Sequence, residues 1–273
     1  MELIKGITKI DGSDFSIYYI ETISDELKQE IRSRLVAICH GMEQVDSKSK
    51  IYSYKATVKE FIKRYKANQD NSEDRKKGMI GELLVHILLE IEGRFITSSP
   101  YFNMEERSFR KGYDVVLFEE NTNLLWIAEV KSGQIQKKQK RSSTAAVSLI
   151  NTAKNDLNTR LNEENQSLWL NALAAARSAM SSKGTQKNAV IKLLEKCASD
   201  SVDEIHSSKD HNVILAGVLF HPITEKIEEN KIKQKQSKIV EENIFKKTIV
   251  MAIQKSTFEA VFDFLEGEAK DEE

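Results

Sequence analysis

NLLWIAEVKSGQ, residues 123–134, has the pattern of a buried strand that ends in two charges, Glu129 and Lys131. Side chains alternate along a strand, so the stretch should present two different faces. One face would carry Leu125, Ile127, Glu129 and Lys131, and the other Trp126, Ala128 and Val130. Because a buried charge is costly alone, the pair needs an internal partner, solvent at the strand end or a bound ion.

The composition around this strand is that of a globular protein. Of the 273 residues, 30% are charged and 40% hydrophobic, and only 2 are Pro, which favours long helices with some strands. No stretch approaches the ~18 apolar residues of a membrane span, and no apolar signal segment opens the chain. We therefore expect a cytoplasmic protein without a membrane partner. Cys39 and Cys197 lack metal-ligand spacing and should be reduced thiols.

The order of periodic segments predicts an α/β or α+β fold with a mixed sheet flanked by helices. Helices are expected over residues 25–42, 54–66, 78–92, 142–161, 167–180, 188–198 and 258–266, and strands within 1–22 and over 94–99, 113–120, 124–133, 212–222 and 247–254. The polar segments 68–77 and 225–243 are expected to be a break and a linker. We place a boundary near residue 70, between an N-terminal α/β region, 1–70, and a second domain, 71–273.

Three charged residues of the second domain can meet in one catalytic site. Glu129 and Lys131 share a strand face, and hairpin pairing with the preceding strand would bring Asp114 near Glu129. Carboxylates suit a hard divalent cation, so we expect Asp114 and Glu129 to be ligands of Mg²⁺ or Mn²⁺. Lys131 would orient the attacking water or help to deprotonate it, and would offset charge on a scissile phosphate.

Glu82 is the fourth candidate, as a ligand of a second metal ion or of a metal-bound water. It lies early in the helix over 78–92, where Gly78 and Gly81 would allow close approach to the sheet. Each of these residues also has an ordinary structural explanation. Asp114 can be a turn residue, Glu82 can complement a helix dipole, and Glu129 can pair with Lys131 at a strand end.

The residues that follow the strand indicate contact with a polyanion such as DNA. Gln134 can contact phosphate or the attacking water, and a basic run can follow a nucleic-acid backbone. That run consists of Lys137, Lys138, Lys140 and Arg141. Between Lys131 and Lys196, twelve basic residues stand against four acidic ones. A solvated loop and a solvated helical face would explain the same charges.

Asp114, the triplet Glu129-Val130-Lys131 and the Gly-Glu pair that ends in Glu82 on the preceding helix together resemble the PD-(D/E)xK nuclease superfamily. The resemblance implies a restriction-endonuclease-like αβββαβ core over residues 76–221 and a metal-dependent phosphodiester hydrolase. Tyr113 stands where the motif has Pro.

GMIGE (78–82), YDVV (113–116) and AEVKSG (128–133) are also similar to the nuclease effectors of the Hachiman antiphage system. That similarity implies a Mg²⁺-dependent DNase that a HamB-like helicase subunit holds in check until the complex meets invading DNA. Two alternatives remain open at this point: a restriction or repair nuclease with another partner, and an inactive nuclease-fold subunit that binds DNA.

Overall fold

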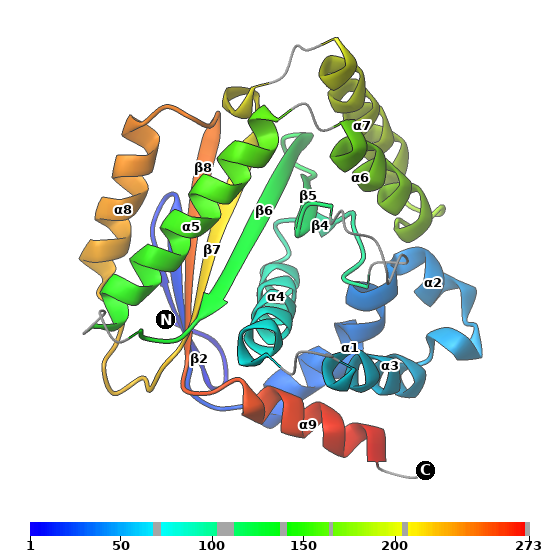
Figure 1. The fold of residues 1–273 in the computed structure, drawn as a ribbon. Helices are drawn as coiled ribbons and strands as arrows, with labels where there is room; N and C mark the ends of the chain where they lie inside the picture. The colour runs from blue at the N-terminus through cyan, green and yellow to red at the C-terminus, as the bar shows by residue number, and fades with distance from the viewer. Residues whose placement is uncertain (68–71, 103–111, 137–140, 164–165, 204–206, 271–273) are drawn as a thin grey trace.

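The computed structural model describes residues 1–67, 72–102, 112–136, 141–163, 166–203 and 207–270. These residues form an eight-stranded mixed sheet flanked by helices (Figure 1), which confirms the predicted α/β class. In spatial order the strands are β1 (Glu2–Ile4), β2 (Ile7–Asp11), β3 (Phe15–Ile20), β8 (Lys247–Lys255), β7 (Asn212–Phe220), β6 (Leu124–Gly133), β5 (Val115–Glu119) and β4 (Ile96–Thr97).

The middle of the sheet is parallel and both sides are antiparallel. β3, β8, β7 and β6 run parallel to one another, whereas β1, β2 and β3 pair antiparallel, as do β4, β5 and β6. The first three strands thus belong to the same sheet as the later ones, joined by the pairing of β3 with β8. The boundary near residue 70 stays a prediction.

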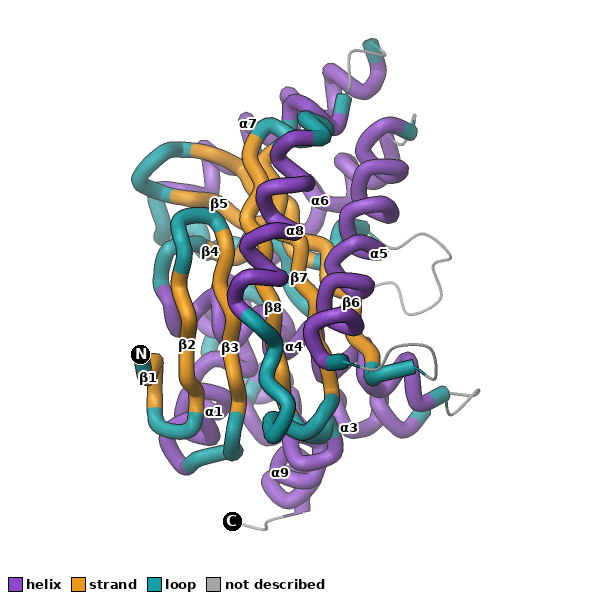
Figure 2. Tube along the Cα trace, turned by 90° about the vertical axis from the view of Figure 1, so that its left-hand side faces the viewer, coloured by secondary structure: helices purple, strands orange, loops and turns teal. Residues whose placement is uncertain are grey.

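Helices cover both faces of the sheet and bury one apolar cluster on each. One face is covered by α1 (Asp25–His40), α3 (Tyr54–Lys66), α4 (Glu73–Glu92) and α9 (Glu259–Lys270). The other is covered by α5 (Ser142–Asn162), α6 (Gln166–Ala179), α7 (Gln186–Val202) and α8 (Glu229–Glu241). Figure 2 shows α5 and α8 side by side over the second face. The short elements are α2 (Met42–Ser47), η1 (Lys50–Tyr52) and η2 (Ser208–Asp210).

The element order from α4 to β7 follows the order expected for the core. α4 leads to β4, β5 and β6, then to α5, and β7 returns to the sheet after the inserted helices α6 and α7. Cys39 and Cys197 are free thiols, as predicted. No helix within the described ranges is both long and apolar enough to cross a membrane.

Two predictions about polar segments were wrong. Residues 229–241, expected in a linker, form α8, because Ile232 and Ile239 lie seven residues apart and bury one face of the helix. Part of the expected break over 68–77 is the first turn of α4. The Ser72 hydroxyl caps that helix by accepting a hydrogen bond from the Arg75 N–H at 3.3 Å, and acidic residues in the first turn complement its dipole.

Candidate active site

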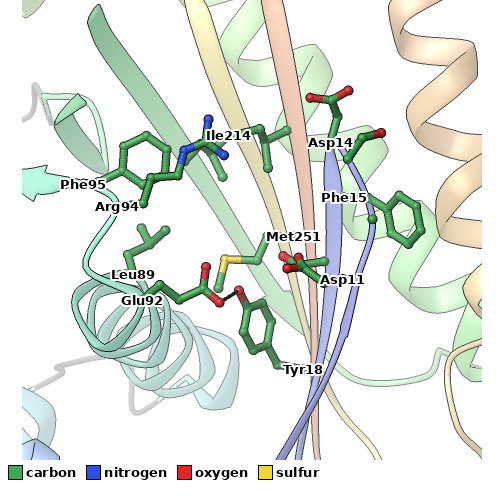
Figure 3. A pocket seen from close by; sticks show the side chains of 14 residues that line it. Asp11, Asp14, Phe15, Tyr18, Leu89, Glu92, Arg94, Phe95, Ile214 and Met251 are labelled. Atoms are coloured by element: carbon green, nitrogen blue, oxygen red, sulfur yellow. Dashed lines mark hydrogen bonds between the residues drawn. The ribbon is translucent and has the colours of Figure 1, made fainter. Parts of the chain in front are cut away.

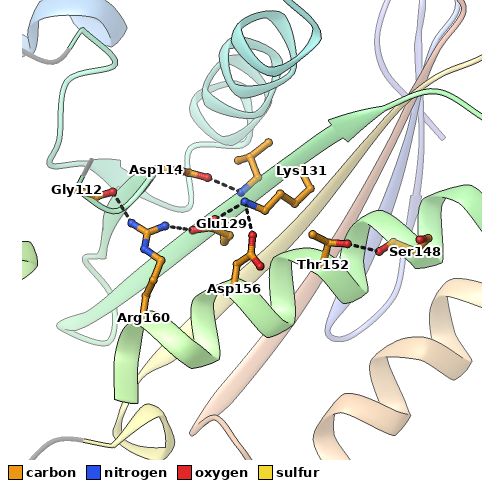
Figure 4. A network of polar contacts seen from close by, with 9 residues as sticks. Gly112, Asp114, Glu129, Lys131, Ser148, Thr152, Asp156 and Arg160 are labelled. Atoms are coloured by element: carbon orange, nitrogen blue, oxygen red, sulfur yellow. Dashed lines mark hydrogen bonds and ion pairs between the residues drawn. The ribbon is translucent and has the colours of Figure 1, made fainter. Parts of the chain in front are cut away.

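The end of β6 carries its two charged residues on the face that α5 covers. Ile127 belongs to the apolar cluster beneath α5, whereas Trp126 and Val130 belong to the cluster beneath α4. The alternation predicted from the sequence is therefore confirmed. Glu129 is 1% exposed, and both Glu129 and Lys131 contact side chains of α5 (Figure 4).

Asp114 lies directly before β5 and beside Glu129. β5 and β6 form the predicted antiparallel hairpin, in which Val115 pairs with Ala128. The next position in that register sets Asp114 opposite Glu129. The Oδ2 atom of Asp114 accepts a hydrogen bond from the Val130 N–H at 2.9 Å. The hairpin therefore brings Asp114 and Glu129 together.

Both carboxylate oxygens of Glu129 contact cations. Oε1 lies 2.9 Å from Nζ of Lys131, and Oε2 lies 2.6 Å from a guanidinium nitrogen of Arg160. Burial and the nearby charge of Asp114 raise the pKa of Glu129, although Arg160 and Lys131 oppose the shift. A carboxylate in this situation is stabilised in its charged form by any further cation placed beside it.

Lys131 bridges two carboxylates. Its Nζ lies 2.9 Å from Oε1 of Glu129 and 2.8 Å from Oδ2 of Asp156. Burial alone would lower the pKa of Lys131, but the carboxylates around it outweigh burial and the pKa is raised. In this arrangement Lys131 is a cation that can offset negative charge, and its part in activating a water stays a prediction.

Asp156 and Arg160 of α5 complete the network, and neither was predicted from the sequence as a site residue. They lie four residues apart on a helix and so project from the same face. Arg160 also donates to the Gly112 carbonyl at 2.5 Å, and its guanidinium carbon lies 5.3 Å from the ring centre of Tyr113. The sequence does contain a signal for them: Asp156 and Arg160 are an acidic and a basic residue four positions apart, in the helix that follows the strand with Glu129 and Lys131.

α5 reaches this position because Gly217 on β7 allows it to approach the sheet. A Cβ at Gly217 would lie 3.0 Å from Cγ1 of Ile150 and 3.2 Å from the carbonyl oxygen of Ala146. The apolar face of α5 is fully buried there, including Ile150 and Leu157. This close packing holds Asp156 and Arg160 beside the end of β6.

Glu82 lies on α4, in the helical layer on the opposite face of the sheet. Gly81 allows α4 to approach β6, as predicted, since a Cβ there would lie 1.9 Å from Oγ of Ser132. Gly78 does not have that role, because a Cβ there would meet nothing within 4 Å.

Burial raises the pKa of Tyr101 most, and the charges of Glu82 and Asp114 raise it further. The charges of Glu82 and Asp114 therefore both affect the pKa of the Tyr101 hydroxyl. Metal binding by Glu82 stays a prediction.

The predicted substrate-binding residues follow β6. Gln134 is exposed just after the strand, and Arg141 is exposed directly before α5. Lys137, Lys138 and Lys140 lie outside the described residues. Contact of these five side chains with substrate stays a prediction.

The carboxylates of Asp114 and Glu129 are of the type and number that a divalent cation such as Mg²⁺ commonly uses as protein ligands. Mg²⁺ takes oxygen ligands and commonly uses one or two carboxylates together with water and substrate phosphate oxygens. Among the residues that the structure describes, no group of three or more His, Cys, Asp or Glu side chains is arranged to hold a metal. A cation on Asp114 and Glu129 would therefore need water and substrate oxygens, and it would compete with Lys131 and Arg160 for Glu129.

A small cavity of about 50 Å³ lies elsewhere, between the β2–β3 hairpin and the C-terminal end of α4 (Figure 3). Lys9 is buried beside it and bridges Asp11 at 3.0 Å and Glu92 at 2.5 Å. The Tyr18 hydroxyl donates to Glu92 at 2.7 Å. Because Lys9 and Tyr18 supply partners for these carboxylates within the protein, we assign the cavity wall a structural role.

Comparison with known protein families shows a match over nearly the whole chain. The HamA family model matches residues 2–264, and that range contains every residue of the network on β5, β6 and α5. No curated protein matches the chain.

Proposed function

The chain belongs to the HamA family, and we propose that it is a metal-dependent deoxyribonuclease that serves as the effector of an antiphage defence complex. The observation that supports this activity is the placement of Asp114, Glu129 and Lys131 together at the end of the β5–β6 hairpin. The order of elements from α4 to β7 also agrees with the PD-(D/E)xK core that the motif resembles.

Each residue has a role in the proposed hydrolysis. Asp114 and Glu129 would hold Mg²⁺ or Mn²⁺, and Glu82 would hold a further ion or a water from α4. A bound divalent ion of this kind lowers the pKa of water and stabilises charge on a phosphoryl group. Lys131 would stabilise negative charge on the scissile phosphate, and it would orient the attacking water or help to deprotonate it.

The proposed partners are DNA and a helicase subunit similar to HamB. The helicase would hold the nuclease inactive in the cytoplasm until the complex meets invading DNA. Residues 1–70 are the candidate contact region for that subunit, and Gln134 and Arg141 are candidate contacts for the DNA backbone.

The test is Mg²⁺-dependent cleavage of plasmid and linear DNA by the full chain, alone and with its helicase. We expect cleavage that EDTA abolishes and that Glu129→Ala and Lys131→Ala reduce by roughly a hundredfold or more. Glu119→Gln is a matched control, because Glu119 is also a buried carboxylate of this hairpin and pairs with Arg94 at 2.7 Å. Equal cleavage by wild type and Glu129→Ala would contradict the proposal.

One observation favours a second candidate, an inactive nuclease-fold subunit that binds DNA. Lys131 and Arg160 neutralise Glu129 from both sides, as a purely structural ion-pair network would. If this candidate is correct, Glu129→Ala will bind DNA and support defence as well as wild type, and no condition will produce cleavage.

A further inference from the structure

Arg160 connects the two segments that carry the carboxylates of the candidate site. Its guanidinium donates to Oε2 of Glu129 at 2.6 Å and to the carbonyl of Gly112 at 2.5 Å. The Tyr113 ring lies 5.3 Å from the guanidinium carbon and supports the group from one side. The side chain is 22% exposed, so a ligand at the surface can reach it.

Arg160 and Lys131 differ in the partners that remain when Glu129 is engaged elsewhere. Lys131 keeps a second carboxylate, Asp156, at 2.8 Å. Among the residues that the structure describes, Arg160 keeps the neutral carbonyl of Gly112 and the ring of Tyr113 but no second carboxylate. Because a guanidinium does not lose its proton in a protein, its charge then requires another anion.

The charge balance of the network indicates which anion fits. Asp114, Glu129 and Asp156 carry three negative charges against the two positive charges of Lys131 and Arg160, which leaves a net charge of −1. A divalent cation changes that to +1, and a single phosphodiester group restores neutrality. The planar guanidinium also matches two phosphate oxygens, which a lysine does not.

We propose that Arg160 is the phosphate-positioning residue of this site. It leaves Glu129 when a divalent cation binds there, and it donates instead to a phosphate oxygen of the nucleic acid. Cation and nucleic acid therefore bind cooperatively, each raising the affinity for the other by the same factor. This inference rests on the proposed nuclease function and adds the residue that links its two ligands.

The test is calorimetric binding of Mn²⁺ to the full chain, with and without a short oligothymidylate that has a phosphorothioate backbone. This probe keeps the backbone charge and resists cleavage. We expect it to tighten Mn²⁺ binding about tenfold or more in the wild type, within the usual range of coupling between sites. An oligothymidylate with an uncharged methylphosphonate backbone should cause no tightening.

Arg160→Gln should lose this coupling, and Arg160→Lys should keep part of it, because the point charge remains without the planar fork. The lysine variant also provides the measurement if the glutamine variant does not fold. Arg177→Gln is the matched control, since Arg177 pairs with Glu195 on the exposed surface of α6 and α7 and should keep the full coupling.

Two results would overturn the inference: coupling of equal size in wild type and both Arg160 variants, or no tightening in the wild type. Failure of the nuclease proposal has a different signature. In that case the wild type would bind no Mn²⁺, or Glu129→Ala would bind it as tightly as the wild type.

Discussion

The Asp156 carboxylate of α5 lies 2.8 Å from the Lys131 ammonium of β6, so a helix on one face of the sheet holds a side chain at the end of a strand. Asp156 is 47% exposed, and Lys131 has a second partner in Glu129. An ion pair of this kind contributes little to stability, because solvent screens it. Its main effect is to fix where the ammonium lies, which makes α5 part of the site.

Asp156→Asn should therefore affect cleavage more than folding. We expect the free energy of unfolding to change by less than about 1 kcal/mol. Cleavage should fall roughly ten- to a hundredfold, because a displaced Lys131 no longer faces the phosphate. Urea unfolding and single-turnover cleavage measure the two effects, and Asn155→Ala, at the neighbouring exposed position, should change neither. Unaltered cleavage by Asp156→Asn would contradict the role given to this contact.

Gly81 and Gly78 lie in the same helix, α4, but substitution by alanine should change the stability of the protein in opposite directions at the two positions. A Cβ at Gly81 would lie 1.9 Å from Oγ and 2.9 Å from Cβ of Ser132, so Gly81→Ala should destabilise the protein by about 1–3 kcal/mol. Gly78→Ala meets nothing within 4 Å and should stabilise it by about 0.5–1 kcal/mol through helix propensity. Chemical denaturation of both variants tests the pair, and a similar effect of the two substitutions would be inconsistent with the packing of α4 on β6.

Glu90 should make stability depend on pH. Burial raises its pKa from 4.5 to about 7, against the opposing charge of Arg34. Between those values the folded chain keeps a proton that the unfolded chain has lost, so the free energy of unfolding falls as pH rises through this window. Glu90→Gln cannot ionise and should gain on the order of 2–3 kcal/mol relative to wild type between pH 4.5 and 7. Urea unfolding at several pH values measures this difference. If the free energy of unfolding of wild type and of Glu90→Gln changes with pH in parallel, Glu90 does not make this contribution.

Ile239→Ala should show that α8 is a packed helix. Ile239 is 1% exposed in the cluster beneath α5 to α8, so its truncation should cost about 2–5 kcal/mol. Val240, the next residue, is 53% exposed, and Val240→Ala should change stability by less than about 0.5 kcal/mol. Thermal or urea unfolding compares the two, and equal small effects would be the result expected of a linker.

The parts of the fold that the sequence predicted depend on local signals. The Ser24 hydroxyl caps α1 by accepting from the Leu27 N–H at 3.1 Å, and Gly93 ends α4 with φ of 66°. The hairpin of β5 and β6 is also local, so strand alternation and a short turn were enough to predict Asp114 beside Glu129. α8 was missed because its Lys, Glu and Gln residues suit a solvated linker as well as a helix.

The α5 side of the site depends on contacts between distant segments. Asp156 and Arg160 reach Lys131 and Glu129 only because α5 packs closely over Gly217, far along the chain on β7. The basic surplus of the middle segment is likewise reduced by partners elsewhere. The pairs include Lys154 with Glu242, Lys183 with Asp46 and Lys187 with Glu43. A count of charges along residues 131–196 therefore overestimates the number of basic side chains that are free of acidic partners.

The pairing of β3 with β8 also sets the order in which the molecule can assemble. Phe15 lies opposite Val250, so β3 is synthesised long before the strand that it pairs with, β8. Until residues 247–255 leave the ribosome, β3 and β7 each expose an unpaired edge where β8 will lie. Asp114, Glu129 and Arg160 are synthesised well before that strand. The sheet can therefore be completed only after β8 has been made, and long-range parallel pairing of this kind predicts slow folding.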